Sequence, residues 1–246
     1  LIDANAENLS FSSDSRQNPF YTQATSTSWQ DLRSNASIVM YMNAYEDPRR
    51  ASYFSKSGYD GIYVGVRAGI QNVTPTDYAT YSYPLFAEKD PVPVMYASES
   101  WFLRAEAKLR WTDAGQQSVK ELYEKGIEVS IRNQKSYRQS DAAAAWTEKK
   151  LTAPDWAAID DAAISSYIND DTSSPEGYTD PWKPEYNSDP TTSITVKWDE
   201  GASNEEKLER IITQKWIANF PLSTEAWADY RRTGYPKLFR PKQNLA

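Results

Sequence analysis

Residues 99–133 read ESWFLRAEAKLRWTDAGQQSVKELYEKGIEVSIRN, and this stretch decides the fold. Each half repeats apolar side chains at steps of three and four residues, which places them on one face of a helix. The repeating positions are Trp101, Phe102, Ala105 and Leu109, then Val119, Leu122, Tyr123, Gly126, Ile127 and Ile131. The short turn at residues 112–115 makes the two helices antiparallel, and the small residues Ala105 and Gly126 allow close contact. Such a hairpin cannot bury its apolar face alone, so the rest of the chain is expected to pack on it.

The composition describes an acidic globular chain that is rich in aromatic residues. Of its 246 residues, 39% are apolar and 13% are aromatic, and the net charge is −7. This charge argues against nucleic acid as a partner, because phosphate binding requires a basic surface. No apolar run reaches about 18 residues, so no membrane-spanning helix is expected.

Histidine and cysteine are both absent, which limits the chemistry. A Ser-His-Asp triad, a thiolate nucleophile and a cysteine-based metal site are therefore excluded. Adjacent carboxylates occur at Asp160-Asp161, Asp170-Asp171 and Glu205-Glu206. Neighbours on a helix point about 100° apart, so these are not the facing pair of a glycosidase. The sequence predicts a protein that is not an enzyme and uses no cofactor.

Further helices are expected on both sides of the hairpin, from their caps and stops. In chain order they run from a cap at Thr27 or Ser28 to Asp47-Pro48, over the alanine-rich residues 141–151, from Pro154 onward, from a cap at Asn204 to Phe220, and over 225–233 up to Gly234. Because short connections join them in pairs, the sequence predicts a mostly α fold of tetratricopeptide-like antiparallel helix pairs, with long irregular loops and little β structure.

The longest irregular segment is residues 169–195. It holds four prolines and a glycine, Pro175, Pro181, Pro184, Pro190 and Gly177. Neither a helix interior nor a central strand tolerates this pattern, and a loop of this length in a compact domain is often functional. Asp170, Asp180 and Asp189 offer oxygen ligands for calcium, but no Asp-x-Asp-x-Asp-Gly loop supports such a site.

The sequence becomes specific near its C-terminus. Residues 212–239 read ITQKWIANFPLSTEAWADYRRTGYPKLF, which resembles the C-terminal signature of the SusD/RagB family. The hairpin is similar to the same family at residues 98–107 and 123–132. Residues 39–54, with Glu46-Asp47-Pro48-Arg49-Arg50, resemble its Asp-Pro-Arg segment, and Asn18-Pro19-Phe20-Tyr21 is similar to a segment upstream in some members. The matches run in the expected order over most of the chain.

The resemblance implies a non-catalytic, surface-exposed lipoprotein of the outer membrane. Such proteins bind oligosaccharide or polysaccharide and act as a lid on a TonB-dependent transporter barrel. Family members are considerably longer, so residues 1–246 are expected to form the C-terminal region of one, without the N-terminal portion. Membrane association is then expected through a lipid anchor outside this chain. Two alternatives stay open, namely a module that docks on the transporter without glycan contact, and a peptide-binding member.

Two segments have the make-up of a glycan site, in which flat aromatic faces meet sugar C–H surfaces and polar groups meet their edges. The candidate ligand-binding residues are Phe20, Tyr21 and Trp29 in the first segment, and Tyr178, Trp182 and Tyr186 in the loop. By the resemblance, the upstream segment contributes to ligand sites. The competing interpretation for each ring is loop anchoring, because large aromatic residues are mostly buried.

Other prominent side chains have structural interpretations. Core packing is expected for three tryptophans on apolar helix faces, Trp101, Trp216 and Trp227. Arg231 and Arg232 with Asp229 are interpreted as an ion pair at a helix end. Asp47 and Arg49 are expected to fix a turn rather than to bind sugar.

Overall fold

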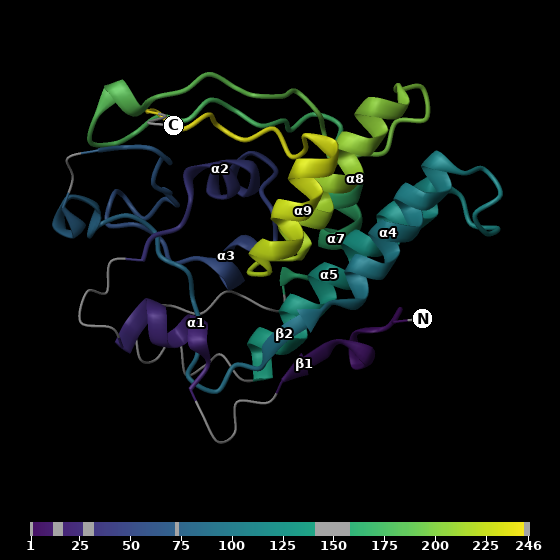
Figure 1. The fold of residues 1–246 in the computed structure, drawn as a ribbon, viewed down its shortest axis with the longest axis horizontal. Helices are drawn as coiled ribbons and strands as arrows, with labels where there is room; N and C mark the ends of the chain where they lie inside the picture. Colours follow the sequence, from purple (N-terminus) through teal and green to yellow (C-terminus); the bar gives the residue numbers. More distant parts are fainter. Residues whose placement is uncertain (1, 12–16, 27–31, 72–73, 141–157, 244–246) are drawn as a thin grey trace.

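The computed structural model describes residues 2–11, 17–26, 32–71, 74–140 and 158–243. Within these ranges the fold is mostly helical, with a small two-stranded antiparallel sheet (Figure 1). The helices are α1 (Pro19–Tyr21), α2 (Ala36–Ala44), α3 (Arg50–Tyr53), α4 (Ala97–Arg110), α5 (Val119–Ser140), α7 (Asp161–Ile168), α8 (Asn204–Ala218) and α9 (Ser223–Thr233). The strands are β1 (Leu9–Phe11) and β2 (Val92–Met95), and single helical turns are η1 (Asn5–Glu7), η2 (Thr22–Ser26), η3 (Pro75–Tyr78) and η5 (Pro184–Tyr186). None of the described helices has both the length and the apolar character that crossing a bilayer requires.

The predicted hairpin is confirmed as α4 and α5, and α8 packs against both helices (Figure 1). Gly115 lies in the connecting turn with φ of +80°, a value that favours glycine. Gly126 faces Phe102 so closely that a Cβ on it would lie 2.9 Å from the ring. The absence of a side chain at Gly126 therefore lets the two helices approach each other.

A buried ion network joins α4, α8 and α9. Lys215 Nζ lies 3.1 Å from a Glu99 carboxylate oxygen and 2.8 Å from one of Asp229. Arg232 extends the network, because its Nη2 lies 2.6 Å from Glu106 Oε2 and 2.6 Å from Asp229 Oδ1. The ion-pair interpretation of Asp229 and Arg232 is thus confirmed, and the pairs hold the C-terminal helix on the hairpin.

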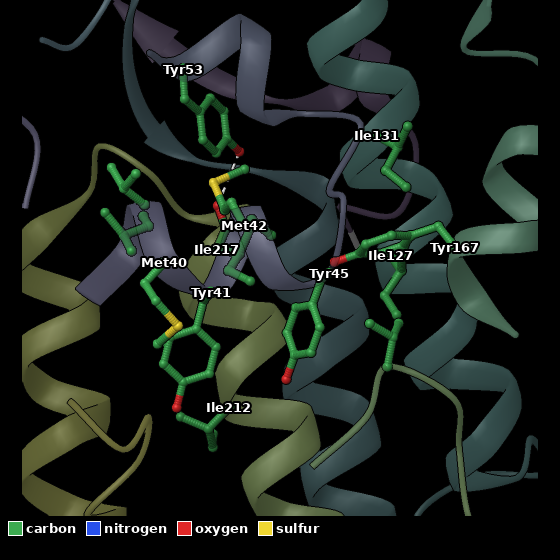
Figure 2. Close-up of a cluster of buried hydrophobic side chains, with 14 of the residues drawn as sticks. Met40, Tyr41, Met42, Tyr45, Tyr53, Ile127, Ile131, Tyr167, Ile212 and Ile217 are labelled. Atoms are coloured by element: carbon green, nitrogen blue, oxygen red, sulfur yellow. Dashed lines mark hydrogen bonds between the residues drawn. The ribbon is translucent and has the colours of Figure 1, made fainter. Parts of the chain in front are cut away.

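The central core lies where α2 and α3 meet α5, α7 and α8 (Figure 2). It is rich in buried tyrosine and isoleucine, including Tyr41, Tyr45, Tyr53, Ile127, Ile131, Tyr167, Ile212 and Ile217. Arg49 is 1% exposed within it, and its backbone N–H and guanidinium both donate to the Asp47 carboxylate. Asp47 and Arg49 do fix the turn after α2, as expected from the sequence.

Several predicted helix starts differ from the observed ones. Helix α2 begins at Ala36 after the cap Asn35, whose side chain accepts from the Ser37 N–H, so Leu32 precedes the helix. Three predicted starts lie outside the described residues. They are the cap at Thr27 or Ser28, the start of the alanine-rich helix at residue 141, and Pro154. Helix α8 is capped by Ser203, not Asn204, because Ser203 and Glu206 form a reciprocal capping box. Helix α9 starts at Ser223, two residues before the predicted start at residue 225.

Candidate functional site: a polar cleft beside α2

Asp180 fastens the long loop at residues 169–195 to the core. Its carboxylate, 5% exposed, accepts hydrogen bonds from the Tyr81 and Tyr178 hydroxyls at 2.8 and 2.9 Å. It also accepts from the backbone N–H groups of Trp182 and Lys183. Burial is the main cause that raises the pKa of both phenols above the ordinary value of 10.0, and the nearby Asp180 carboxylate raises it further. Both hydroxyls therefore stay protonated and act as hydrogen-bond donors. Asp180 therefore anchors the loop. Its carboxylate oxygens, which a calcium ion would need as ligands, are already engaged in these hydrogen bonds.

The loop then folds back on itself beside Tyr178. Tyr178 and Ser188 exchange backbone hydrogen bonds of 2.7 and 2.9 Å. A Cβ on Gly177 would lie 2.7 Å from the Ser188 carbonyl oxygen, which explains the glycine at this crossing. Arg67 donates to the carbonyls of Tyr186 and Arg240, so the far end of the loop is also tied down. The loop is a fixed wall, as a preformed binding site requires.

A cleft of about 680 Å³ separates this wall from α2. It is lined by Ala36, Val39, Met40, Asn43 and Ala44 of α2, by Glu46, by residues 62–65, and by residues 172–174 and 176–179. Its volume falls in the range of about 300–1,000 Å³ that is usual for small-molecule sites. Hydroxyl, amide, carboxylate and phenol groups all reach this cleft, and α2 supplies an apolar floor.

Asn43 and Tyr63 form an ordered pair on one side of the cleft. The Asn43 amide donates to the Tyr63 carbonyl at 2.9 Å and accepts from Arg50 at 3.1 Å. The Arg50 guanidinium lies 4.7 Å from the centre of the Tyr63 ring, a cation–π contact. Both side chains are thus held in place before any ligand arrives.

The opposite rim is ordered by Asp170. Its Oδ1 accepts from the Thr172 and Ser173 backbone N–H groups at 2.9 and 3.0 Å and from the Thr172 hydroxyl at 2.8 Å. Burial alone raises the pKa of Asp170, but these hydrogen bonds from Ser173 and Thr172 outweigh it and lower the pKa to about 2. Asp170 is therefore ionised and fixes the rim that faces α2.

Two glutamates, Glu46 and Glu176, line the cleft and are exposed. Within the described part of the chain, neither carboxylate forms a hydrogen bond or an ion pair. Glu46 directly follows the cap residue of α2 and has φ of +49°, in the left-handed region that usually selects glycine. Its side chain is thus retained at a position where the backbone does not favour one.

A second, mostly apolar groove of about 440 Å³ lies between α1, α8 and α9. Phe20 lines it and stacks on Phe86 with ring centres 5.3 Å apart. Trp227 also lines it and is 60% exposed, with its ring stacked on Tyr230 at 6.1 Å. The prediction that Trp227 packs in the core is therefore wrong, whereas Trp101 is buried as predicted.

The predicted ligand residues do not converge on one site. Phe20 lines the apolar groove, Tyr21 is half-buried beside it in α1, and Trp29 lies outside the described residues. Tyr178 lines the polar cleft, although it is 6% exposed and holds the loop through its hydroxyl. Trp182 is 38% exposed and packs edge-on against Tyr78, whereas Tyr186 is 7% exposed.

Sequence reasoning missed the residues of α2 and the segment after it that face the cleft. Glu46 stood in a segment interpreted as a turn, and Tyr63 and Glu176 were not among the candidate residues. The left-handed backbone of Glu46 has no clear sequence signal, because glycine or asparagine usually marks such a position. Among the described residues, no group of three or more acidic side chains is arranged to hold a metal ion.

The fold and its cleft define a helix-pair protein with a preformed polar cleft. Comparisons with known proteins identify the family. The family model described as "Susd and RagB outer membrane lipoprotein" matches residues 1–156 and 155–246. A comparison with curated proteins gave no match. The chain therefore belongs to the SusD-like family, and the mostly α, tetratricopeptide-like fold class is confirmed.

Solved structures of SusD homologues superpose on nearly the whole chain. A homologue from Bacteroides thetaiotaomicron is 37% identical, with a TM-score of 0.78 over 97% of this chain and 45% of its own. A second protein from that organism is 34% identical, with a TM-score of 0.80 over 100% of this chain and 47% of its own. A chitin-binding homologue from Flavobacterium johnsoniae is 39% identical, with a TM-score of 0.77 over 96% of this chain and 44% of its own. The chain thus spans less than half the length of these relatives.

Proposed function

We propose that this chain is part of a non-catalytic, surface-exposed lipoprotein of the outer membrane that binds glycan and delivers it to a TonB-dependent transporter. The observation that carries the proposal is the preformed polar cleft beside α2, in a chain 39% identical to a chitin-binding homologue. Glycan is the proposed ligand class for two reasons. One homologue binds chitin, and the cleft offers hydroxyl, amide and aromatic groups that can contact sugars.

The cleft suits a sugar chain in three respects. Its hydroxyl-bearing rim at residues 172–174 and the Asn43 amide offer both donors and acceptors for sugar hydroxyls. Tyr63 supplies a ring whose orientation is fixed by Arg50. Asp180 ties one wall to the core and Asp170 orders the rim, so little ordering entropy is lost on binding.

The aromatic residues predicted from the sequence take two roles in this proposal. Trp182, Phe20 and Tyr21 would contact longer ligands outside the cleft, and Trp29 stays a candidate from the sequence alone. Tyr178 and Tyr186 would hold the loop, because their rings are buried.

Binding without hydrolysis follows from the state of the cleft carboxylates. A glycosidase needs a carboxylic acid kept protonated by an apolar pocket and a second carboxylate across the scissile bond. Glu46 and Glu176 are exposed and no described residue holds either in position. We therefore assign them to ligand contact and expect no release of reducing sugar.

Affinity electrophoresis in gels that contain single polysaccharides tests this function. Retardation by at least one polysaccharide, with no reducing ends released on long incubation, is the expected result. Free migration in every gel of a broad panel would overturn the proposal. Release of sugar that disappears in Glu176→Gln would instead establish a hydrolase.

The apolar groove supports a second function, docking on a partner. Trp227 is 60% exposed and continues the apolar groove that Phe20 lines, and exposed apolar patches commonly mark protein contacts. Co-purification with a large outer-membrane barrel, lost in Trp227→Ala while glycan retardation persists, would show that this surface docks. Glycan retardation lost in the same variant would instead place the groove in the glycan site.

A further inference from the structure

We propose that the cleft beside α2 selects glycans by charge: it binds uncharged sugar units, gains affinity from amino groups, and rejects uronate or sulfate groups. This inference rests on the proposed function and specifies its ligand class.

The side chains that line the cleft are acidic or neutral. Glu46 and Glu176 bring two carboxylates, and none of the described lining residues is lysine or arginine. Because neither carboxylate has a hydrogen-bond or ion-pair partner among the described residues, their charge is not compensated locally. A ligand amine would meet two available acceptors there, whereas a ligand carboxylate would meet like charge.

Two cations close to the cleft, Arg50 and Lys197, are already engaged. Arg50 lies behind the wall, where it donates to Asn43 and covers the Tyr63 ring. Lys197 is paired with Asp171, with Nζ 2.6 Å from Oδ2, next to the rim. Asp170 adds a further negative charge at the rim, held ionised by its hydrogen bonds. The lining of the cleft itself therefore offers no cation to an acidic sugar.

The direction of α2 strengthens the same preference. Helix α2 lines the cleft from its first residue, Ala36, to its last, Ala44, so the negative end of the helix dipole lies at the end of the cleft where Glu46 stands. Glutamate is unfavourable there, both for the dipole and for its φ of +49°. A cationic ligand group beside Glu46 would offset the unfavourable interaction between its carboxylate and the helix dipole.

Three matched tetrasaccharides test the inference, made of N-acetylglucosamine, glucosamine and glucuronic acid units. Titration calorimetry is performed on the protein at low salt, below the pH at which glucosamine loses its proton. We expect the amino form to bind at least about threefold tighter than the neutral form, and the acidic form at least about tenfold weaker. Raising the salt concentration should reduce both differences in affinity, because exposed charges are screened.

The double variant Glu46→Gln/Glu176→Gln keeps the side-chain length and removes both charges. It should bind the three tetrasaccharides with nearly equal affinity, whereas Asp113→Asn, in the exposed turn between α4 and α5, should leave the order unchanged. Circular dichroism confirms that each variant is folded.

The possible failures are distinguishable. If the protein binds the acidic and neutral tetrasaccharides equally well, or if the double variant keeps the wild-type order, the charge selection is wrong while glycan binding stands. If none of the three binds and no polysaccharide retards the protein, the proposed function falls as well.

Discussion

The guanidinium of Arg49 forms a fully buried ion pair with Asp47, two residues away, with Nη2 2.6 Å from Oδ2. The same group donates to Ser130 on α5, Tyr167 on α7 and Gln214 on α8, at 2.9 to 3.0 Å. One side chain thus joins the turn after α2 to three helices distant in sequence. Because α2 forms the floor of the cleft, this network also positions the candidate site.

Arg49→Met should lower the free energy of unfolding by about 3–5 kcal/mol, because it leaves the buried Asp47 carboxylate without its counter-ion. Urea denaturation monitored by tryptophan fluorescence measures the loss. Arg132→Met is the matched control, because Arg132 pairs with Glu128 and Asp161 at the surface. It should lower the free energy of unfolding by less than about 1 kcal/mol. Equal losses for the two variants would contradict the structural role given to Arg49.

Gly126→Val should destabilise the protein by about 3 kcal/mol, because the new side chain enters the space of the Phe102 ring. Phe102→Leu reduces that ring, so the double variant should lose less stability than the sum of the single variants. A double-mutant cycle of unfolding free energies measures this coupling. Strict additivity would show that the two residues are not in contact.

The hairpin and α8 could be predicted because periodic apolar residues report directly on a buried helix face. The exposure of Trp227 could not be predicted, because a buried ion pair occupies the inner face of α9. Asp229 is 4% exposed where it meets Lys215, so Trp227, two residues earlier, lies on the outer side. A tryptophan beside an aspartate normally suggests the opposite arrangement.

The candidate site was less predictable than the fold. The long loop was interpreted as a candidate functional segment, but its cleft depends on packing against α2 and Glu46, which lie far away in the sequence. No local pattern reports such a contact. For the same reason the sequence indicated aromatic ligand residues in two segments, Phe20 and Tyr178 among them, which the structure places at different surfaces.

Asp170 should make the protein sensitive to acid. Its pKa is about 2 in the folded chain against an ordinary value of 3.8, so it contributes stability above about pH 4 that is lost as the pH falls towards 2. The stability difference between wild type and Asp170→Asn should therefore shrink on going from about pH 5.5 to about pH 2.5. Urea midpoints at both pH values measure it, and a constant difference would mean that Asp170 is not stabilised as an anion.

Trp182→Ala should weaken glycan binding by about three- to tenfold, the usual worth of one aromatic contact, with little change in the unfolding temperature. Its ring is 38% exposed and packs on Tyr78 by its edge. Trp111→Ala is the control, because Trp111 is 61% exposed at the end of the hairpin, outside both the cleft and the groove. Calorimetric titration compares them, and equal affinities would remove Trp182 from the proposed contacts.

Blocking the cleft beside α2 tests whether glycan binds there. Thr179 is exposed and lines the cleft, so Thr179→Trp should fill it without unfolding the chain. A polysaccharide that retards the wild-type protein is cut into oligosaccharides and titrated into both proteins in a calorimeter. Saturable heat is expected with the wild type and none with Thr179→Trp. Equal binding by a folded Thr179→Trp variant would contradict it.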